Sequence, residues 1–480
     1  MRPAAALFCA SLLCACSFPA PPTLLPPPFG PDTAHPQTAR LFFPTGIAID
    51  STDAGVPRWV VVANPNADRL YDAGAMYSLP AAELLQYFPS PPPPKGTPPK
   101  TPPFPAAALA GQVITGNYMG PMVLVGGTAY TGSRDTNRLN AVALDSATGS
   151  LTCRTGDTVD CRAGSVDLNR AAQLEGPFGI AQASIRLPGA PDPGVPAILV
   201  SSLVPHVDEI QSGVVFTSSR LAALATSDPT TVLFSATVTD RLNGSGFGGG
   251  PLIFDDRARE AIVAGCFTRF GAASAGGEPS TLKCGTLASG SNLLRFVPVD
   301  AGSSAHARLY DLGTQINSSD TTGLAMGDVD AASGLRRLYM ITRFADTLVR
   351  VGLPADPAFV PVVESVVPLP AQPSQILRLN RPTGTSGPEL LAITLVATYE
   401  TSTTAGKLVV VDGLRGRVLG QVDRLGDAPF AIAQFPAVAG DKSARLAITL
   451  FGGCGIALVD VPYDNPADAA LRARVGSCTP

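Results

Sequence analysis

The sequence has few of the residues that carry acid–base or metal chemistry. Its 480 residues include three histidines, one tryptophan and 15% charged side chains. The histidines (His35, His206 and His306) lie far apart, and no CxxC pair occurs, so the spacings typical of zinc sites are missing. The Walker A loop, the G-x-S-x-G elbow, the HExxH helix and the EF-hand loop are missing too. We therefore expect no cofactor, no metal and no enzymatic activity.

Two further absences narrow the class of partner. The net charge is −4 and no basic patch stands out, which argues against nucleic-acid binding. GSGFGG (244–249) matches the dinucleotide fingerprint by letter, but Pro251 and a strand-like LIF follow where that fingerprint needs a helix.

No apolar run is long enough to span a membrane, a length that takes roughly 20 residues. The N-terminus instead has Arg2 followed by a short apolar stretch (4–15), which is typical of an export signal. The stretch ends in LCAC, which resembles the lipobox of bacterial lipoproteins. That resemblance implies cleavage before Cys16 and a diacylglycerol on its sulfur. An ordinary secretory signal with a chance cysteine, or a different cleavage point near Cys9 or Cys14, is the alternative.

These features predict three segments: a lipoprotein signal peptide (1–15), a proline-rich tether (16–38) and one domain (39–480). Proline blocks helix and favours extended polyproline II, so the tether acts as a spacer between membrane and domain. We expect the protein in the bacterial cell envelope, at the outer membrane if the host is Gram-negative, because Ser17 rather than Asp follows the lipid cysteine.

Six cysteines remain after the signal, in three couples that are local in sequence. An exported chain with an even number of cysteines favours disulfides over metal binding. We expect three bridges: Cys153–Cys161, Cys266–Cys284 and Cys454–Cys478.

The 48 glycines and 47 prolines are spread along the chain, as many short strands and turns require. A short strand that begins with Pro or Gly recurs seven times, each time followed by a hairpin. We call this short strand the opener of its unit. The openers lie near positions 44, 121, 177, 246, 322, 373 and 429, about 64 residues apart on average. In the third unit we take GVVFT as part of the hairpin. VALD, VVVD and ALVD each close an apolar strand with an aspartate that we expect to begin a turn.

A repeat of this length with almost no helical periodicity predicts an all-β fold, a β-propeller with seven blades of mainly four antiparallel strands. FPTGIAID (43–50), WVVVANPNADRL (59–70) and LYMITRFADTLVRV (338–351) resemble the NHL/YVTN-type propellers of secreted bacterial proteins and surface lipoproteins. The resemblance covers about 40 to 475 and implies a fold, not an activity. Closure of the ring suggests a blade shared between the termini, with ARLFF (39–43) or LRARVG (471–476) as the joining strand.

Two insertions interrupt the repeat. PSPPPPKGTPPKTPPFP (89–105) is expected to form a solvated loop on the edge of the propeller, with a docking arm for a partner as the sharper alternative. CRTGDTVDC (153–161) is expected to be a loop closed by its own disulfide.

Polar side chains recur where the openers begin. In a propeller the first strand of each blade lines the channel, so these positions would surround one axis. They make a candidate binding mouth for a cation or a basic ligand, formed by Glu175, Asp320, Gln372 and Asp427. The alternative is that these acidic residues occur here because strand openers lie in solvent-exposed turns, where acidic residues are common.

The sequence thus predicts a lipid-anchored propeller that binds or scaffolds other envelope components without catalysis. The alternative is a propeller enzyme of the lactonase or lyase kind. That alternative would need Glu175, Asp320 and Asp427 within one metal coordination sphere.

Overall fold

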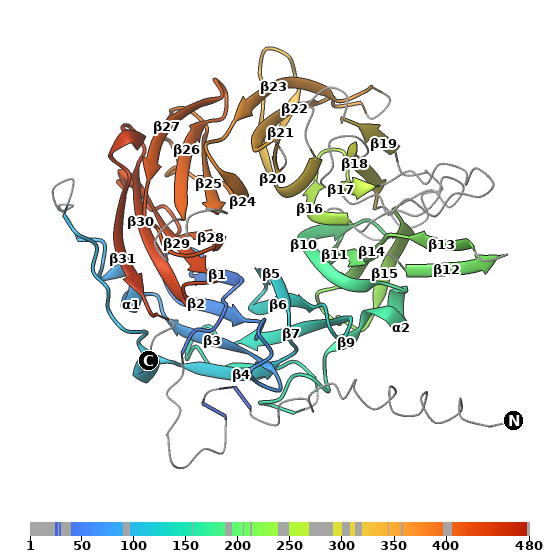
Figure 1. Ribbon diagram of the computed structural model, residues 1–480, viewed down its shortest axis with the longest axis horizontal. Coiled ribbons are helices and arrows are strands. Elements are labelled where there is room, and N and C mark those ends of the chain that lie inside the picture. The colour runs from blue at the N-terminus through green and yellow to red at the C-terminus, as the bar shows by residue number, and fades with distance from the viewer. Residues whose placement is uncertain are drawn as a thin grey trace, which may run out of the picture.

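The computed structural model of the chain is a closed ring of seven β-sheets around a central axis, each with a path of four antiparallel strands (Figure 1). This confirms the predicted all-β, seven-bladed propeller. The structure describes residues 25–26, 28–29, 40–89, 97–155, 157–187, 194–204, 206–211, 214–238, 249–267, 291–299, 308–312, 319–343, 345–356, 359–396 and 406–477. The predicted signal peptide (1–15), Cys16 and most of the tether lie outside these residues.

In every blade the strands follow one another outward from the axis. Blade 1 contains β1 (Gly46–Ser51), β2 (Pro57–Asn64), β3 (Gly74–Pro80) and β4 (Gly111–Thr115). Blade 2 contains β5 (Met119–Val125), β6 (Thr128–Ser133), β7 (Arg138–Leu144) and β8 (Leu151–Cys153), and β9 (Val166–Asp167) also pairs with β7. Blade 3 contains β10 (Glu175–Ile185), β11 (Val195–Val204), β14 (Arg220–Ala225) and β15 (Val232–Thr237).

The remaining blades have the same order. Blade 4 contains β16 (Gly249–Asp255), β17 (Glu260–Phe267), β18 (Ser291–Pro298) and β19 (Arg308–Asp311). Blade 5 contains β20 (Ser319–Val329), β21 (Arg336–Arg343), β22 (Thr347–Leu353) and β23 (Val362–Pro368). Blade 6 contains β24 (Gln372–Arg378), β25 (Leu390–Val396), β26 (Lys407–Asp412) and β27 (Arg417–Val422). Blade 7 contains β28 (Pro429–Gln434), β29 (Ser443–Leu450), β30 (Gly455–Pro462) and β31 (Ala470–Val475).

Helix is scarce among the described residues. The helical segments are α1 (Ala82–Leu85), α2 (Leu168–Ala172) and the 3-10 turns η1 (Ala106–Ala108) and η3 (Pro466–Asp468). α2 begins where the side chain of Asp167 accepts a hydrogen bond from the Arg170 backbone N–H at 2.9 Å, which is an N-cap.

The core lies between the blades, because each blade is a sheet with two faces to bury. Strand β25 (LLAITLV) shows how the sequence provides for both faces: Leu390 and Ala392 pack toward blade 7, whereas Leu391 and Ile393 pack toward blade 5. Successive strand residues point to opposite faces, so a strand buried on both sides needs a continuous apolar run. One apolar cluster of this kind fills each of the seven junctions.

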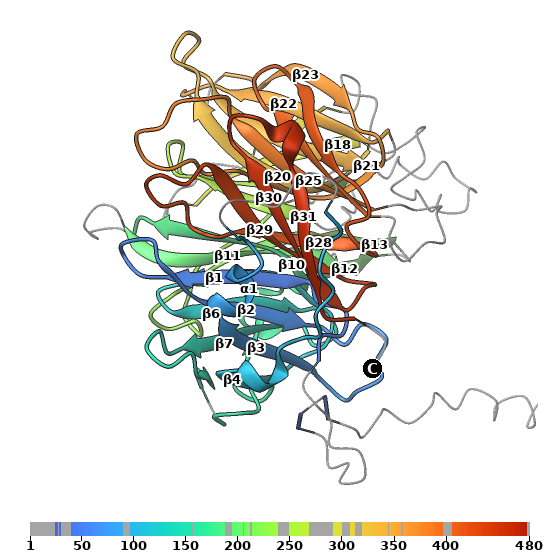
Figure 2. The ribbon, with the colours of Figure 1, turned by 90° about the vertical axis from the view of Figure 1, so that its left-hand side faces the viewer.

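The ring closes differently from the prediction. No blade is shared between the termini, because all four strands of blade 1 and of blade 7 are consecutive in the chain. LRARVG (471–476) belongs almost entirely to β31, which pairs with β30 in its own blade, and ARLFF (39–43) precedes β1. The first and last blades lie side by side (Figure 2). Closure comes from side-chain packing of β1–β3 against β28–β31, with Val62, Tyr77, Ile456 and Leu458 among the buried residues.

Both insertions cover the outer edge of a neighbouring blade. After the proline run (90–96 lie outside the described residues), the Lys100 N–H donates to the Arg472 carbonyl at 3.1 Å, and the Arg474 N–H donates to the Lys100 carbonyl at 2.8 Å. This parallel pairing holds the segment 97–105 against β31 through Lys100, whereas residues 97, 98, 100, 101 and 103 are exposed, so the predicted loop at the propeller's edge is solvated but hydrogen-bonded to the last blade. We call this segment the clasp. The disulfide loop pairs in parallel with β4, where the Cys161 N–H donates to the Ile114 carbonyl at 2.9 Å.

The third unit differs from the prediction as well. The VVFT part of this segment falls in β13 (Val214–Ser218), which pairs with β12 (His206–Gln211) as a separate hairpin, and the third strand of the blade is β14. The hairpin extends away from the ring (Figure 1).

Two of the three predicted aspartate turns are confirmed. Asp145 accepts from the Ala147 N–H at 2.8 Å and Asp412 accepts from the Leu414 N–H at 3.0 Å, as in Asx turns. Asp460 instead lies within β30 and forms an ion pair with Arg472 at 2.7 Å.

The Cys153–Cys161 disulfide is present, with Cα atoms 5.0 Å apart. Cys454 is also disulfide-bonded, and Cys478, its expected partner, lies outside the described residues. Cys266–Cys284 stays a prediction, because Cys284 is likewise outside them.

Candidate functional site

The innermost strands all begin on one face of the ring, which we call the mouth face; the opposite side is the rear face. These strands are β1, β5, β10, β16, β20, β24 and β28. The predicted mouth residues lie there: Glu175 and Gln372 are the first residues of β10 and β24, Asp320 is the second residue of β20, and Asp427 precedes β28.

The structure gives these acids separate environments. Glu175 Oε1 lies 3.0 Å from His206 Nδ1, so this carboxylate already has a partner. The carboxylate of Asp427 lies against Gly452, where a Cβ would stand 2.3 Å from Oδ2. The Asp320 side chain is outside the described residues, so the cation-binding mouth stays a prediction. Within the part of the chain that the structure describes, no three His, Cys, Asp or Glu side chains are grouped to hold a metal.

The start of the innermost strands has a recurrent geometry. Phe43, Tyr118 and Ala428 precede their strands and Gly176 is the second residue of β10, and all four have φ between 46° and 56°. This left-handed conformation is rare for residues other than glycine, and it turns the chain sharply into the channel wall.

Hydroxyl groups then join neighbouring blades around the channel. Thr45 Oγ1 donates to the Met119 carbonyl at 2.9 Å, Thr322 Oγ1 to the Pro373 carbonyl at 3.2 Å, and Ser374 Oγ to the Pro429 carbonyl at 2.7 Å. Thr45 directly precedes β1, and the other donors and all three acceptors lie in innermost strands of consecutive blades. These bonds satisfy backbone carbonyls at the axis and join neighbouring blades at the mouth.

The most distinctive feature of the mouth face is an alternating stack of cations and aromatic rings from three blades. The Arg69 guanidinium lies 5.1 Å from the Tyr118 ring centroid, and the Arg134 guanidinium lies 5.9 Å from the same ring. Arg134 also lies 5.6 Å from the Phe178 ring of β10. Contacts within about 6 Å are cation–π interactions. We call these four residues the mouth stack.

Arg134 is the central residue of the mouth stack. Its Nε donates to the Tyr118 carbonyl at 3.2 Å, which fixes the plane of the guanidinium. Burial lowers the pKa of this guanidinium from its ordinary value, although arginine stays charged at any physiological pH. The Nη atoms have no hydrogen-bond acceptor among the described residues, so two parallel N–H donors remain for a carboxylate or phosphate.

Sequence reasoning missed this stack. One signal was present, because GSRDTNRL (132–139) and ITRFADTL (341–348) carry an arginine at the same offset in the hairpins of units two and five. Arg343 Nε donates to the Pro373 carbonyl at 3.4 Å, which joins blade 5 to the start of β24.

Another aromatic group lies where the ring closes. The Phe43 and Phe451 ring centroids are 5.1 Å apart, and Phe430 lies 6.3 Å from Phe451. All three rings are half-buried on the mouth face of blades 1 and 7, so they add apolar surface to the mouth.

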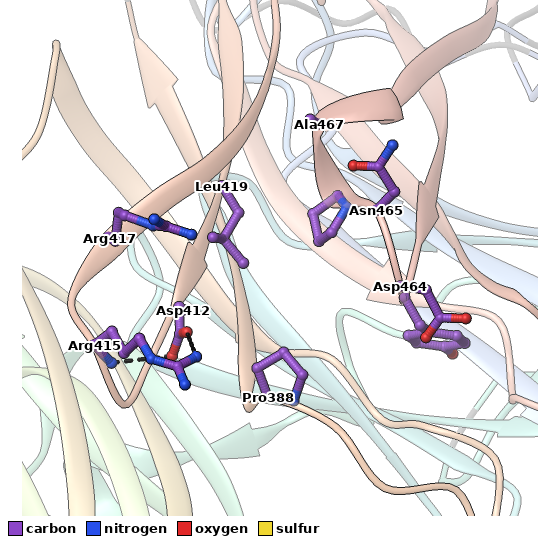
Figure 3. Close-up of a pocket in the computed structure, with 10 residues that line it drawn as sticks. Pro388, Asp412, Arg415, Arg417, Leu419, Asp464, Asn465 and Ala467 are labelled. Atoms are coloured by element: carbon purple, nitrogen blue, oxygen red, sulfur yellow. Dashed lines mark hydrogen bonds and ion pairs between the residues drawn. The ribbon is translucent and has the colours of Figure 1, made fainter.

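A pocket of about 450 Å³ opens on the rear face between blades 6 and 7 (Figure 3). Arg415, Arg417 and Asp412 line one side, and Asp464 and Asn465 line the other. Arg415 is tied to Asp412 at 3.0 Å, whereas Arg417 stands exposed at the start of β27. This polar site lies on the opposite face from the predicted mouth residues.

No helix among the described residues is long and apolar enough to cross a membrane.

Comparison with known proteins shows no matching family model and no matching curated protein. Among solved structures, Sqt1 from Chaetomium thermophilum is 12% identical over 89% of this chain and 86% of its own, with a TM-score of 0.48. A Synechocystis apocarotenoid oxygenase mutant is 13% identical over 90% and 88%, with a TM-score of 0.41. A Lactobacillus plantarum protein is 13% identical over 79% and 84%, with a TM-score of 0.39. Similarity this distant carries no argument about activity.

Proposed function

We propose that this protein is an exported propeller, anchored by a lipid at Cys16, that binds or scaffolds components of the bacterial cell envelope without catalysis. The LCAC sequence and the proline-rich tether support the anchor. The openers support an origin among NHL/YVTN-type propellers. In a Gram-negative host the outer membrane is the proposed location.

The mouth stack is the observation that carries the binding role. Arg134 is positioned by Tyr118 and Phe178, and its Nη atoms have no hydrogen-bond acceptor among the described residues. A cation held in advance loses little conformational entropy on binding, which suits recognition of an anionic group on a partner. Glu175 is engaged with His206, which leaves the stack as the better-defined recognition element of the described mouth.

Affinity capture from solubilised envelopes tests the binding role. Arg134→Gln removes the charge of the stack, whereas Arg417→Gln removes an exposed charge on the rear face and serves as the matched control. We expect wild type and Arg417→Gln to recover the same partner, and Arg134→Gln to recover about tenfold less, the loss that corresponds to one charge-assisted contact. Equal recovery by all three proteins, with equal thermal stability, would refute the role of the mouth stack.

The anchor and the enzymatic alternative have separate tests. Mass analysis of the mature N-terminus should show a lipidated Cys16, and the Cys16→Ala protein should leave the membrane fraction. A Cys16→Ala protein that still sediments with membranes would refute the anchor. Metal analysis of the purified protein addresses the lactonase- or lyase-like alternative: stoichiometric metal that is lost on substitution of Glu175 or Asp427 would favour that enzyme over a binding protein.

A further inference from the structure

The outer edge of blade 5 carries an unusual amount of exposed apolar surface. Phe359 and Val360, just before β23, are 63% and 62% exposed, and Val362 and Val366 within β23 are 51% and 39% exposed. Leu414, 41% exposed, lies on the adjacent turn of blade 6, whose Gly413 carbonyl accepts from Arg350 of β22 at 3.1 Å. Exposed apolar side chains that gather along one outer strand suit an interaction surface.

Three other outer strands of the ring, β4, β27 and β31, are covered by the chain itself. The clasp pairs with β31, the disulfide loop pairs with β4, and η3 lies against β27, where a Cβ on Gly420 would stand 2.0 Å from the Pro466 carbonyl. Among the described residues, no backbone hydrogen bond reaches the outer edge of β23. An uncovered edge with exposed valines is a template for another strand.

The sequence of β23 indicates which strand fits. Residues 361–368 are PVVESVVP, nearly the same in both directions. If two copies align antiparallel about a two-fold axis between Glu364 and Ser365, proline faces proline and valine faces valine. Val362 then opposes Val367 of the partner subunit, and Val363 opposes Val366 of the partner subunit.

Charge and chain direction agree with this register. Glu364 opposes Ser365 of the partner subunit, so the two carboxylates do not face each other directly. Each Glu364 is also neutralised by Arg350 of its own subunit, with Nε and Oε2 2.7 Å apart.

Pro361 and Pro368 lack an N–H donor and therefore limit the pairing to the residues between them. β23 is bulged at Glu364, because Ser365 pairs with Arg350 and Val363 with Val351 of β22, so the pairing would form two short stretches on either side of the bulge. The bulge also brings Val362 and Val367 onto the same side of the strand, as this register requires.

We propose that two copies of this chain associate through β23, edge to edge, to form a two-fold symmetric dimer with a continuous eight-stranded sheet across the two fifth blades. The interface is isologous, as in most homodimers. Because the clasp and the mouth stack lie on other parts of the ring, the dimer leaves the mouth face open in both subunits.

Native mass spectrometry of the full chain released from detergent tests the proposal. We expect a mass of two chains for wild type, and a dissociation constant at least about tenfold weaker for Val366→Lys, because the ammonium group would be buried without a partner. Val56→Lys is the matched control, since Val56 is 53% exposed on a turn of blade 1, and it should dimerise like wild type. A monomeric wild type, or a Val366→Lys protein that dimerises equally well, would overturn the proposal.

Cysteine pairs test the register independently. A mixture of Val363→Cys and Val366→Cys chains should form an intermolecular disulfide under mild oxidation, whereas each variant alone should not. A dimer that shows no such crosslink, or that crosslinks equally in the single-variant samples, would exclude this arrangement of β23.

Discussion

The clasp should contribute measurably to closure of the ring. Lys100→Pro tests this by removing a single backbone hydrogen-bond donor of the clasp. The substitution removes the N–H that donates to the Arg472 carbonyl at 3.1 Å. A backbone hydrogen bond contributes roughly 0.5–1.5 kcal/mol, and a partly buried carbonyl left without a donor adds a penalty of similar size. We therefore expect the free energy of unfolding to fall by about 1–3 kcal/mol.

The upper limit follows if the whole clasp detaches. Three backbone hydrogen bonds join it to the last blade, the third from the Gly476 N–H to the Pro102 carbonyl at 3.0 Å. Their combined loss would be about 1.5–4.5 kcal/mol. Phe104, whose ring centroid lies 6.2 Å from that of Tyr77, would then lose part of its packing as well.

Thr101→Pro is the matched control. The Lys100 N–H and carbonyl both point to β31, so the Thr101 N–H points away and the same substitution there removes no bond of the clasp. Urea unfolding gives the free energies, and hydrogen exchange of 470–477 reports on the Arg474 and Gly476 amides directly. If Lys100→Pro and Thr101→Pro unfold alike and exchange these amides alike, the clasp does not support closure.

Three further predictions concern stability. Replacing Cys153 and Cys161 by serine should lower the free energy of unfolding by about 2.5 kcal/mol from loop entropy, measured in urea against wild type; an unchanged midpoint would contradict this estimate. Glu389→Gln should lower the free energy of unfolding by about 3 kcal/mol, because the neutral amide keeps the hydrogen bond from the Tyr339 hydroxyl but breaks the ion pair between the buried carboxylate and Arg378 Nε, 2.8 Å apart; a loss no larger than that at an exposed glutamate would contradict this. The backbone N–H of Ala147 lowers the pKa of Asp145 in the folded protein. The stabilising effect of this carboxylate is therefore present above the usual carboxyl pKa of about 4 and is lost as pH falls through the lower folded value. Asp145→Asn should make the melting temperature less dependent on pH in this acidic range, and an unchanged dependence would refute the argument.

The sequence alone determined the number of units and placed six of the seven innermost strands to within three residues of where they begin, whereas the fourth opener, at position 246, lies outside the described residues. Every unit carries its own hairpin signals, and strands such as LLAITLV are apolar on both faces because a blade is buried on both sides. The near disulfide, Cys153–Cys161, was also predictable, since eight residues of separation leave the two thiols close in any turn-like loop.

Tertiary structure alone decided how the ring closes and what lies at its mouth. The parallel bridge between Lys100 and Ala473 has no local sequence signature. Its two partners are hundreds of residues apart, and the apolar–polar pattern around one of them carries no information about the other. The mouth stack likewise joins turns and strand starts of three blades, so Arg69, Tyr118, Arg134 and Phe178 meet only once the blades are arranged around the axis. Periodicity encodes which faces are buried, whereas contacts between polar turns depend on the relative placement of whole blades, which no local pattern contains.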